Sequence, residues 1–183
     1  QSYLHLDSDL IVWPETAVAT YWDKTTLAFE PLKRLAKEHN TQIISGTVIR
    51  ESTRAGADYY NGLMAFGAED GSYYKQRLVP FGEYVPLESW LRGAIDFFNL
   101  PMSAFKLPSQ KQGLLTQNIA IAGNICYEIA YPQLVAQQAA QAQLILTVSN
   151  DTWFEHSLAP WQHLQMAQMR ALENGKPVVR ATN

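Results

Sequence analysis

Short strand-like runs alternate along this chain with segments whose apolar residues recur at helical spacing. The runs that predict strands cover residues 10–13, 43–49, 59–66, 72–75, 119–125, 144–148 and a stretch that opens at 178. The segments that predict helices cover residues 25–39, 132–142 and 158–173. Strands that alternate with helices are typical of an α/β protein. A turn at 68–71 joins two strands as a hairpin, which predicts a mixed sheet.

Two of the predicted helices carry further signals. Pro31 lies inside the first and leaves open whether that helix begins or bends there. The last ends at Asn174-Gly175, a strong stop signal. Its apolar side chains fall on one face, namely Leu158, Trp161, Leu164, Ala167 and Ala171.

Composition excludes several classes of protein. The 183 residues are 47% apolar, which suffices for one domain with a sizeable core. Net charge is −3, from 14 basic and 17 acidic side chains spread along the chain, so no basic block indicates nucleic acid. No apolar stretch approaches the roughly 20 residues that cross a bilayer. The sequence opens at Gln1 and closes just after a predicted core strand, so we expect residues 1–183 to be one domain of a longer chain.

Cys126 is the only cysteine and directly follows the apolar run 119–125. A lone cysteine cannot form a disulfide within the chain, and by itself it cannot make a thiolate metal site. It is therefore either a small buried hydrophobe or a nucleophile. The choice depends on whether a base and a cation accompany it.

Three polar residues lie just past predicted strands, where α/β proteins gather functional groups. Glu15 follows the first strand through a proline, Lys75 closes the hairpin, and Cys126 closes its apolar run. A carboxylate within reach can take the thiol proton as the sulfur attacks a carbonyl. A lysine favours the thiolate and stabilises the tetrahedral oxyanion. The product would be an acyl-enzyme thioester, which water or an amine then resolves.

Structural interpretations of the same residues stay open at this point. Cys126 at the end of an apolar strand is commonly a core residue. Glu15 after Trp-Pro fits a helix N-cap, and Lys75 fits a solvated strand end. The non-enzymatic hypothesis is therefore a binding or scaffolding domain in which Cys126 is inert.

No other constellation indicates chemistry. The four histidines show no metal-ligand spacing, so we predict no metal. His156 and His163 fall seven residues apart, and we interpret both as structural. Neither a phosphate-binding glycine-rich loop nor a Gly-x-Ser-x-Gly elbow occurs.

Residues 80–108 are rich in proline and aromatic side chains and predict a long loop with a short helix near 87–97. One interpretation is a surface loop folded over a small hydrophobic cluster. The other is a lid, from Phe81 to Phe105, that meets lipid, because the segment is aromatic yet carries a few charges. Loops of this length in compact domains are usually functional.

Motifs in a fixed order carry a resemblance to a known superfamily. They read Trp13-Pro14-Glu15, Tyr74-Lys75 and Ile125-Cys126-Tyr127-Glu128. Together they resemble the Glu-Lys-Cys pattern of the nitrilase, or carbon–nitrogen hydrolase, superfamily. Within it, residues 79–86, 149–154 and 161–173 resemble the apolipoprotein N-acyltransferases, a bacterial family that adds the third acyl chain to lipoproteins. The resemblance runs from about Leu10 to the last residue.

The resemblance implies a fold and a role for each motif residue. The fold would be a four-layer α-β-β-α sandwich with mixed sheets. Glu15 is similar to the family's general base, Lys75 to its oxyanion-stabilising lysine, and Cys126 to its nucleophile. Glu83 matches a second essential glutamate that orients the lysine and the base. The implied substrate-binding residues are Tyr127 and Glu128 beside the nucleophile, and Phe81, Trp153 and Phe154 at an acyl-chain entrance.

The resemblance also implies a reaction and a location. The acyl donor would be a membrane phospholipid, and the acceptor the amine of a lipoprotein's N-terminal diacylglyceryl-cysteine. The mechanism would be ping-pong through a thioester, with no metal and no cofactor. The catalytic domain would face the periplasm from the bacterial inner membrane. The family's flanking membrane helices, first strand, an upstream tryptophan and final strands are absent from these 183 residues.

A second enzymatic hypothesis is a soluble nitrilase-type amidase that hydrolyses a small amide with the same Glu-Lys-Cys triad. A small-amide pocket does not need the aromatic segment at 81–105 or the pair Trp153-Phe154. Both features therefore favour the acyltransferase.

Overall fold

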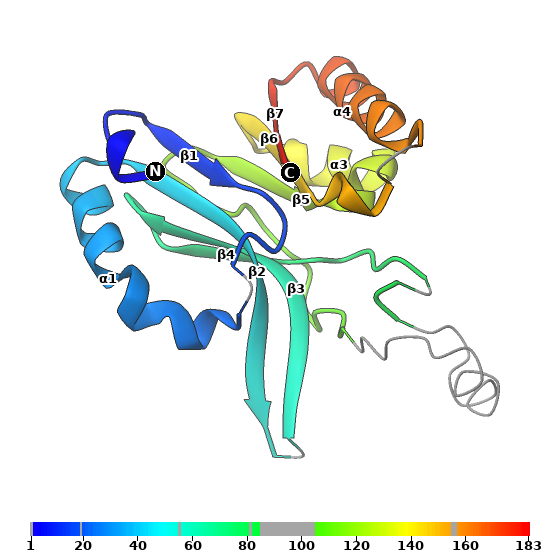
Figure 1. The fold of residues 1–183 in the computed structure, drawn as a ribbon. Helices are drawn as coiled ribbons and strands as arrows, with labels where there is room; N and C mark the ends of the chain where they lie inside the picture. The colour runs from blue at the N-terminus through cyan, green and yellow to red at the C-terminus, as the bar shows by residue number, and fades with distance from the viewer. Residues whose placement is uncertain (1, 19, 55, 81, 85–104, 155–156) are drawn as a thin grey trace.

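The first half of the chain forms a sheet in the order β1-β2-β3-β4 (Figure 1). The computed structural model describes every residue except 1, 19, 55, 81, 85–104 and 155–156. The pairs are parallel between β1 (Leu10–Trp13) and β2 (Gln42–Thr53), and antiparallel from β2 to β3 (Gly56–Gly67) and from β3 to β4 (Gly71–Tyr74). This sheet is mixed, as the sequence predicted.

The second half forms a parallel sheet in the order β5 (Ile121–Ile125), β6 (Leu144–Ser149) and β7 (Val178–Thr182). The helices α3 (Pro132–Ala139) and α4 (Ala159–Asn174) connect its strands. Short 3₁₀ turns are η1 (Ser2–Leu4), η2 (Cys126–Ala130) and η3 (Asp151–Phe154). Gly175 takes a φ of +59° just after α4, which confirms the predicted helix stop.

Three apolar clusters hold four layers together. On the outer face of the first sheet, α1 (Trp22–Glu38) packs Leu32 and Ala36 against Ile43 and Phe66. A second cluster fills the space between the sheets and includes Ile44, Leu63, Tyr73, Ile121, Ile125 and Leu146. The third lies between the second sheet and its helices and includes Val135, Ala139, Ile145 and Ala167. The predicted α/β class and the four-layer α-β-β-α sandwich are confirmed.

A glycine in β5 lets the two sheets approach closely. A Cβ at Gly123 would lie 2.9 Å from Cδ1 of Leu63 and 3.4 Å from the ring of Tyr73. Any larger residue would push the sheets apart at this point. The close approach brings the end of β4 and the end of β5 to the same edge of the sandwich.

The hairpin of β2 and β3 extends well beyond the predicted strands at 43–49 and 59–66. Each strand has 12 residues, and pairing continues to Thr53 and Gly56 at the tip. Residues 51–54 of this arm are exposed and polar, so they lack the apolar pattern on which the prediction rested. The predicted hairpin at 59–75 is confirmed as the β3–β4 pair.

Helix α1 begins three residues earlier than predicted, at Trp22, and continues through Pro31. A proline deprives the carbonyl four residues earlier of its helical donor. That carbonyl belongs to Leu27, a residue that is 90% exposed, so water can donate a hydrogen bond to it instead. Two other predicted elements were too long, since the strand at 119–125 opens at Ile121 and the helix at 132–142 ends at Ala139.

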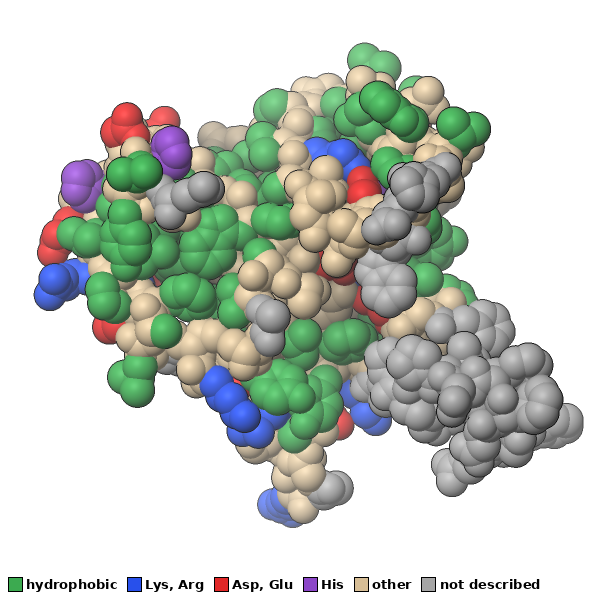
Figure 2. Space-filling view, viewed as in Figure 1, with side chains coloured by type: hydrophobic (Ala, Val, Ile, Leu, Met, Phe, Trp, Pro, Cys, Tyr) green, Lys and Arg blue, Asp and Glu red, His purple; other side chains and the backbone are tan. Residues whose placement is uncertain are grey.

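The apolar face predicted for the last helix is only partly buried, because Ala167 lies in the core but other members of that face do not. Leu158 and Trp161 are 73% and 68% exposed, whereas α4 buries His163, Ala167 and Arg170. Hydrophobic side chains accordingly gather on the outside over α4 in Figure 2. The buried face of α4 is partly polar because it covers a layer of hydrogen-bonded side chains behind Cys126.

Most of the predicted aromatic loop, including Phe81 and the short helix near 87–97, lies outside the described residues. Its described C-terminal end lies against β3, where Lys106 N donates to Tyr59 O at 2.8 Å. Within the described part of the chain, no helix has both the length and the apolar character needed to cross a bilayer.

Candidate active site

Strand ends from both sheets meet at one edge of the sandwich. Glu15 follows β1, Lys75 follows β4, and Cys126 follows β5. Nζ of Lys75 lies 3.8 Å from Oε1 of Glu15, and both charges act on the thiol of Cys126. The structure thus brings together the three residues that the strand ends indicated.

The position of Glu15 depends on a close approach between its backbone and Gly46 of β2. A Cβ at Gly46 would lie only 2.6 Å from Cα of Glu15, so this position accepts no side chain. The Glu15 carboxylate accepts from Nδ2 of Asn61 at 2.8 Å and from N of Asn150 at 3.0 Å. Both oxygens are therefore held in place on a residue that is 9% exposed.

Glu83 completes the cluster, and a residue that sequence reasoning missed links it to Glu15. Glu83 accepts from Nζ of Lys75 at 2.9 Å and from N of Val79 at 2.8 Å. The side-chain amide of Asn61 donates to Glu15 at 2.8 Å and to Glu83 at 2.7 Å, bridging the two carboxylates. The sequence signal that could have revealed Asn61 is its position as a lone amide side chain inside the apolar run of β3.

The ammonium of Lys75 is 1% exposed and lies between these two carboxylates. Burial works to lower the pKa of Lys75, but the charges of Glu15 and Glu83 outweigh it and raise the pKa. The lysine therefore stays charged at neutral pH. Its backbone N–H donates to the carbonyl of Asn61 at 2.9 Å, which fixes the strand end that carries it.

Cys126 opens η2 in the left-handed region, with a φ of +51°. Burial, reinforced by the charge of Glu15, raises the pKa of the thiol to about 12. The charge of Lys75 lowers the pKa of the thiol, as a lysine is expected to do, and so does the backbone N–H of Tyr127. Their effect is smaller than that of burial and Glu15. The resting group is therefore a protonated thiol, and its attack on a carbonyl requires a base.

Glu128 lies inside the protein rather than at an accessible surface. It is completely buried and accepts from N of Ile125 at 2.9 Å, N of Gln76 at 2.6 Å and Oη of Tyr73 at 2.9 Å. Burial raises its pKa to about 7. These contacts join the chain after Lys75 to the chain before Cys126, which favours a positioning role over contact with substrate.

The other sequence-predicted substrate residues are less enclosed or lie outside the described residues. Tyr127 is 41% exposed and packs edge-on against Tyr131, with ring centroids 5.1 Å apart. Phe154 is also 41% exposed, at the end of η3. Trp153 contributes its backbone to η3, and Phe81 is not among the described residues.

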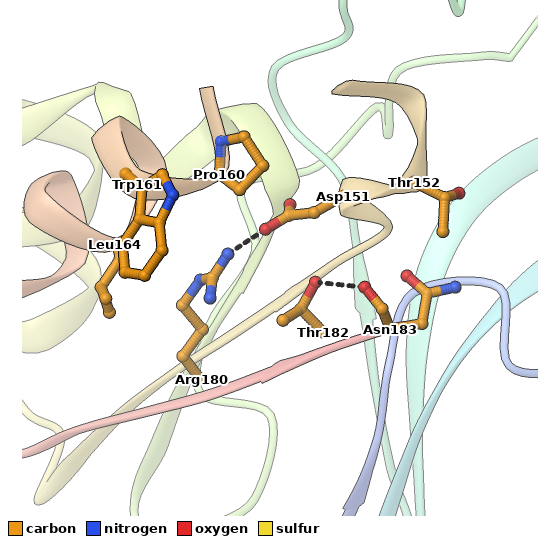
Figure 3. A pocket seen from close by; sticks show the side chains of 8 residues that line it. All are labelled: Asp151, Thr152, Pro160, Trp161, Leu164, Arg180, Thr182 and Asn183. Carbon is orange, nitrogen blue, oxygen red and sulfur yellow. Dashed lines mark hydrogen bonds and ion pairs between the residues drawn. The ribbon is translucent and has the colours of Figure 1, made fainter. Parts of the chain in front are cut away.

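A polar layer lies behind Cys126, under α4. Nε2 of His163 lies 3.0 Å from the carbonyl oxygen of Cys126, and Nδ1 lies 3.2 Å from Oδ1 of Asp151. Asp151 also pairs with Arg180 (Figure 3). The sequence interpretation of His163 as structural did not include its contact with the backbone of Cys126. His156, the other histidine that the sequence analysis interpreted as structural, lies outside the described residues.

A cavity of about 570 Å³ opens beside this layer, between η3, the start of α4 and the end of β7 (Figure 3). Its lining includes Asp151, Trp161 and Arg180, but not Glu15, Lys75 or Cys126. In the described ranges, no three His, Cys, Asp or Glu side chains are grouped to hold a metal ion.

The chain belongs to the carbon–nitrogen hydrolase family, whose model matches residues 2–183. It is similar to the protein named apolipoprotein N-acyltransferase in Pseudomonas putida, with 52% identity over 176 residues, or 96% of this chain. The match covers 35% of that relative, so the chain spans about a third of its length. The family resemblance seen in the sequence is thereby confirmed.

Solved structures share the fold at low sequence identity. The NitFhit protein of C. elegans has a TM-score of 0.68 at 19% identity, covering 97% of this chain and 44% of that one. A mutant amidase from Nesterenkonia sp. AN1 has a TM-score of 0.59 at 19% identity, covering 96% of this chain and 63% of that one. These likenesses place the chain among proteins with the nitrilase-like fold.

Proposed function

We propose that this chain is the catalytic part of an N-acyltransferase that moves an acyl group from a membrane phospholipid to a lipoprotein. The acceptor is the α-amino group of the N-terminal diacylglyceryl-cysteine, and the reaction is ping-pong through a thioester on Cys126. The observation that carries the proposal is the ammonium of Lys75, buried between Glu15 and Glu83 at the edge that also holds Cys126.

In the first half-reaction, the sulfur of Cys126 attacks the ester carbonyl while its proton passes to Glu15. Such a coupled transfer suits a thiol whose pKa is about 12. The oxyanion is stabilised by the ammonium of Lys75 and by the N–H of Tyr127. When the carbon–oxygen bond breaks, the leaving lysophospholipid oxygen takes the proton from Glu15. The acyl group remains on Cys126 as a thioester.

In the second half-reaction, the acceptor amine attacks the thioester carbonyl and gives a proton to Glu15. The carbon–sulfur bond breaks, and the sulfur recovers the proton, so the product is an amide and the enzyme is regenerated. Asn61 and the N–H of Asn150 hold the Glu15 carboxylate for both transfers. Glu83 holds Lys75 in the same way.

A lipid substrate implies a location for the domain at a membrane and an entrance for the acyl chain. We propose that it faces the periplasm at the bacterial inner membrane and that an acyl chain enters past Phe81, Trp153 and Phe154. The exposure of Phe154, at 41%, supports a surface role for this aromatic group. We propose Tyr127 as a substrate contact and Glu128 as the residue that positions the strand ends.

A small-amide hydrolase would use the same cluster and is the competing function. The amidase from Nesterenkonia was solved with covalent addition of the acetamide moiety of fluoroacetamide at its active-site cysteine. The relative from Pseudomonas putida, which is far more similar in sequence, carries the acyltransferase name. That similarity, together with the aromatic pair Trp153-Phe154, favours acyl transfer.

The test separates the two half-reactions in the full-length protein. With phospholipid alone, we expect one lysophospholipid released per enzyme, and then no further turnover. Addition of a diacylglyceryl-cysteine peptide should restart release and acylate the peptide. The Cys126→Ser variant is the matched control and should show no burst. Steady hydrolysis of acetamide without any phospholipid burst would instead establish the amidase.

A further inference from the structure

The carbonyl of the proposed nucleophile is held from behind by a side chain of α4. Nε2 of His163 lies 3.0 Å from the Cys126 carbonyl oxygen, and this histidine is 8% exposed. A carbonyl oxygen can only accept, so Nε2 carries a proton and donates it. The contact therefore ties α4 to the first residue of η2.

Asp151 and Arg180 fix the histidine ring in that orientation. Nδ1 of His163 lies 3.2 Å from Oδ1 of Asp151, and Arg180 pairs with the other oxygen, Oδ2 (Figure 3). Burial works to raise the pKa of Asp151, but hydrogen bonds and the charge of Arg180 lower it overall. Each ring nitrogen of His163 therefore faces an oxygen acceptor, Asp151 on one side and the Cys126 carbonyl on the other.

The peptide group whose carbonyl His163 holds also carries the N–H of Tyr127, and this backbone N–H lowers the pKa of the Cys126 thiol. In a trans peptide the C=O and the N–H point in opposite directions. A donor that fixes the carbonyl therefore also fixes the direction of the N–H. Cys126 takes a φ of +51°, which a residue other than glycine adopts when its surroundings hold it there.

We propose that His163 is a positioning residue for the nucleophile. By holding the Cys126 carbonyl, with Asp151 and Arg180 behind it, it aims the Tyr127 N–H at the reacting sulfur and the substrate oxygen. The inference rests on the proposed function, in which Cys126 attacks an acyl carbonyl. A correctly aimed N–H stabilises the negative charge that develops during that attack. Glu128 accepts from N of Ile125, the residue before Cys126, so the chain is also anchored on the N-terminal side of the nucleophile.

The test compares two amide substitutions in the full-length protein. His163→Gln places an N–H₂ where Nε2 was, so the Cys126 carbonyl keeps a donor. His163→Asn places its amide near Nδ1, so it satisfies Asp151 and leaves the carbonyl without one. We expect His163→Asn to lower kcat about 10- to 100-fold, because small misplacements of reacting groups have that effect. KM for phospholipid should stay unchanged, and His163→Gln should recover most of the rate.

A destabilised control separates positioning from folding. Gln168→Gly weakens α4 at an exposed position and should lower the melting temperature while leaving kcat at the wild-type value. Equal loss of kcat in His163→Gln and His163→Asn, or wild-type kcat in His163→Asn, would overturn the positioning role. If neither histidine variant melts cooperatively, Asp151→Asn replaces them: a smaller loss of kcat at unchanged KM is expected, and wild-type kcat overturns the role.

Cys126→Ser, assayed in parallel, distinguishes failure of this inference from failure of the proposed function. Acyl transfer that survives Cys126→Ser contradicts the proposed function itself. An inactive Cys126→Ser beside a fully active His163→Asn contradicts only the role of His163.

Discussion

Two regions flank Cys126, which we call its front and its back, and they consist of different kinds of groups. In front lie charged side chains, with the ammonium of Lys75 between the carboxylates of Glu15 and Glu83. Behind it, His163 and Glu128 hold main-chain groups rather than the thiol. The front supplies charges that chemistry consumes and restores, whereas the back fixes the direction of the peptides around the sulfur. Substitutions in front should therefore reduce the rate most, and those that act through position should reduce it less.

The largest effects belong to the groups that exchange protons or bonds. Cys126→Ser and Glu15→Gln should each lower acyl transfer by about 10⁴-fold or more, since residues that act as one unit fail together. The thiol pKa of about 12 explains why loss of the base is as severe as loss of the nucleophile. Steady-state transfer assays measure this, with melting curves to check folding. Retention of a substantial fraction of wild-type transfer in either variant would contradict the claim that substitutions in front reduce the rate most.

Glu83→Gln should have the next largest effect, a loss of about 10²-fold in kcat, because it removes one charge that fixes Lys75. Glu83 also raises the pKa of Lys75, so the alkaline limb of the pH–rate profile should move to lower pH. Glu51→Gln makes the same chemical change on the β2 arm and serves as the control. Identical profiles for both variants would contradict the orienting role of Glu83.

The sequence revealed the front of this site far better than the back. Glu15, Lys75 and Cys126 could be predicted because each lies just past the end of a predicted strand, where α/β proteins gather functional groups. Asn61 lies inside an apolar strand, and its role depends on the β3–β4 pairing that brings Lys75 beside it. The role of His163 depends on which face of α4 meets the second sheet, and the apolar pattern of that helix shares only Ala167 with the buried residues His163, Ala167 and Arg170.

Gly46→Ala tests how finely Glu15 must be placed. The added Cβ would meet Cα of Glu15 at 2.6 Å, so the chain that carries the carboxylate must shift. We expect kcat to fall about 10- to 100-fold, as a displacement of this kind predicts. Gly113→Ala is the matched control, since nothing lies within 4 Å of the added atom. The steric argument fails if both variants keep the wild-type rate.

The smallest effect concerns stability and the buried carboxyl of Glu128. Its pKa is about 7 in the folded protein, whereas a solvated glutamate of the unfolded chain has its ordinary pKa of 4.5. Between those values the folded state keeps a proton that the unfolded state has lost, so rising pH weakens the fold. The loss amounts to roughly 3 kcal/mol by pH 8. Urea unfolding at pH 5 and pH 8 should show this decline in the wild type and a smaller one in Glu128→Gln. Parallel declines would contradict it.

The central claim is that Cys126 receives an acyl chain from lipid. Mass spectrometry of the full-length protein after incubation with phospholipid, in the absence of acceptor, tests it most directly. We expect the peptide that contains Cys126 to gain one fatty acyl group, which hydroxylamine at neutral pH then removes, as it does a thioester. The Cys126→Ala variant should gain none. An unmodified Cys126 peptide from protein that still acylates its acceptor would contradict the account.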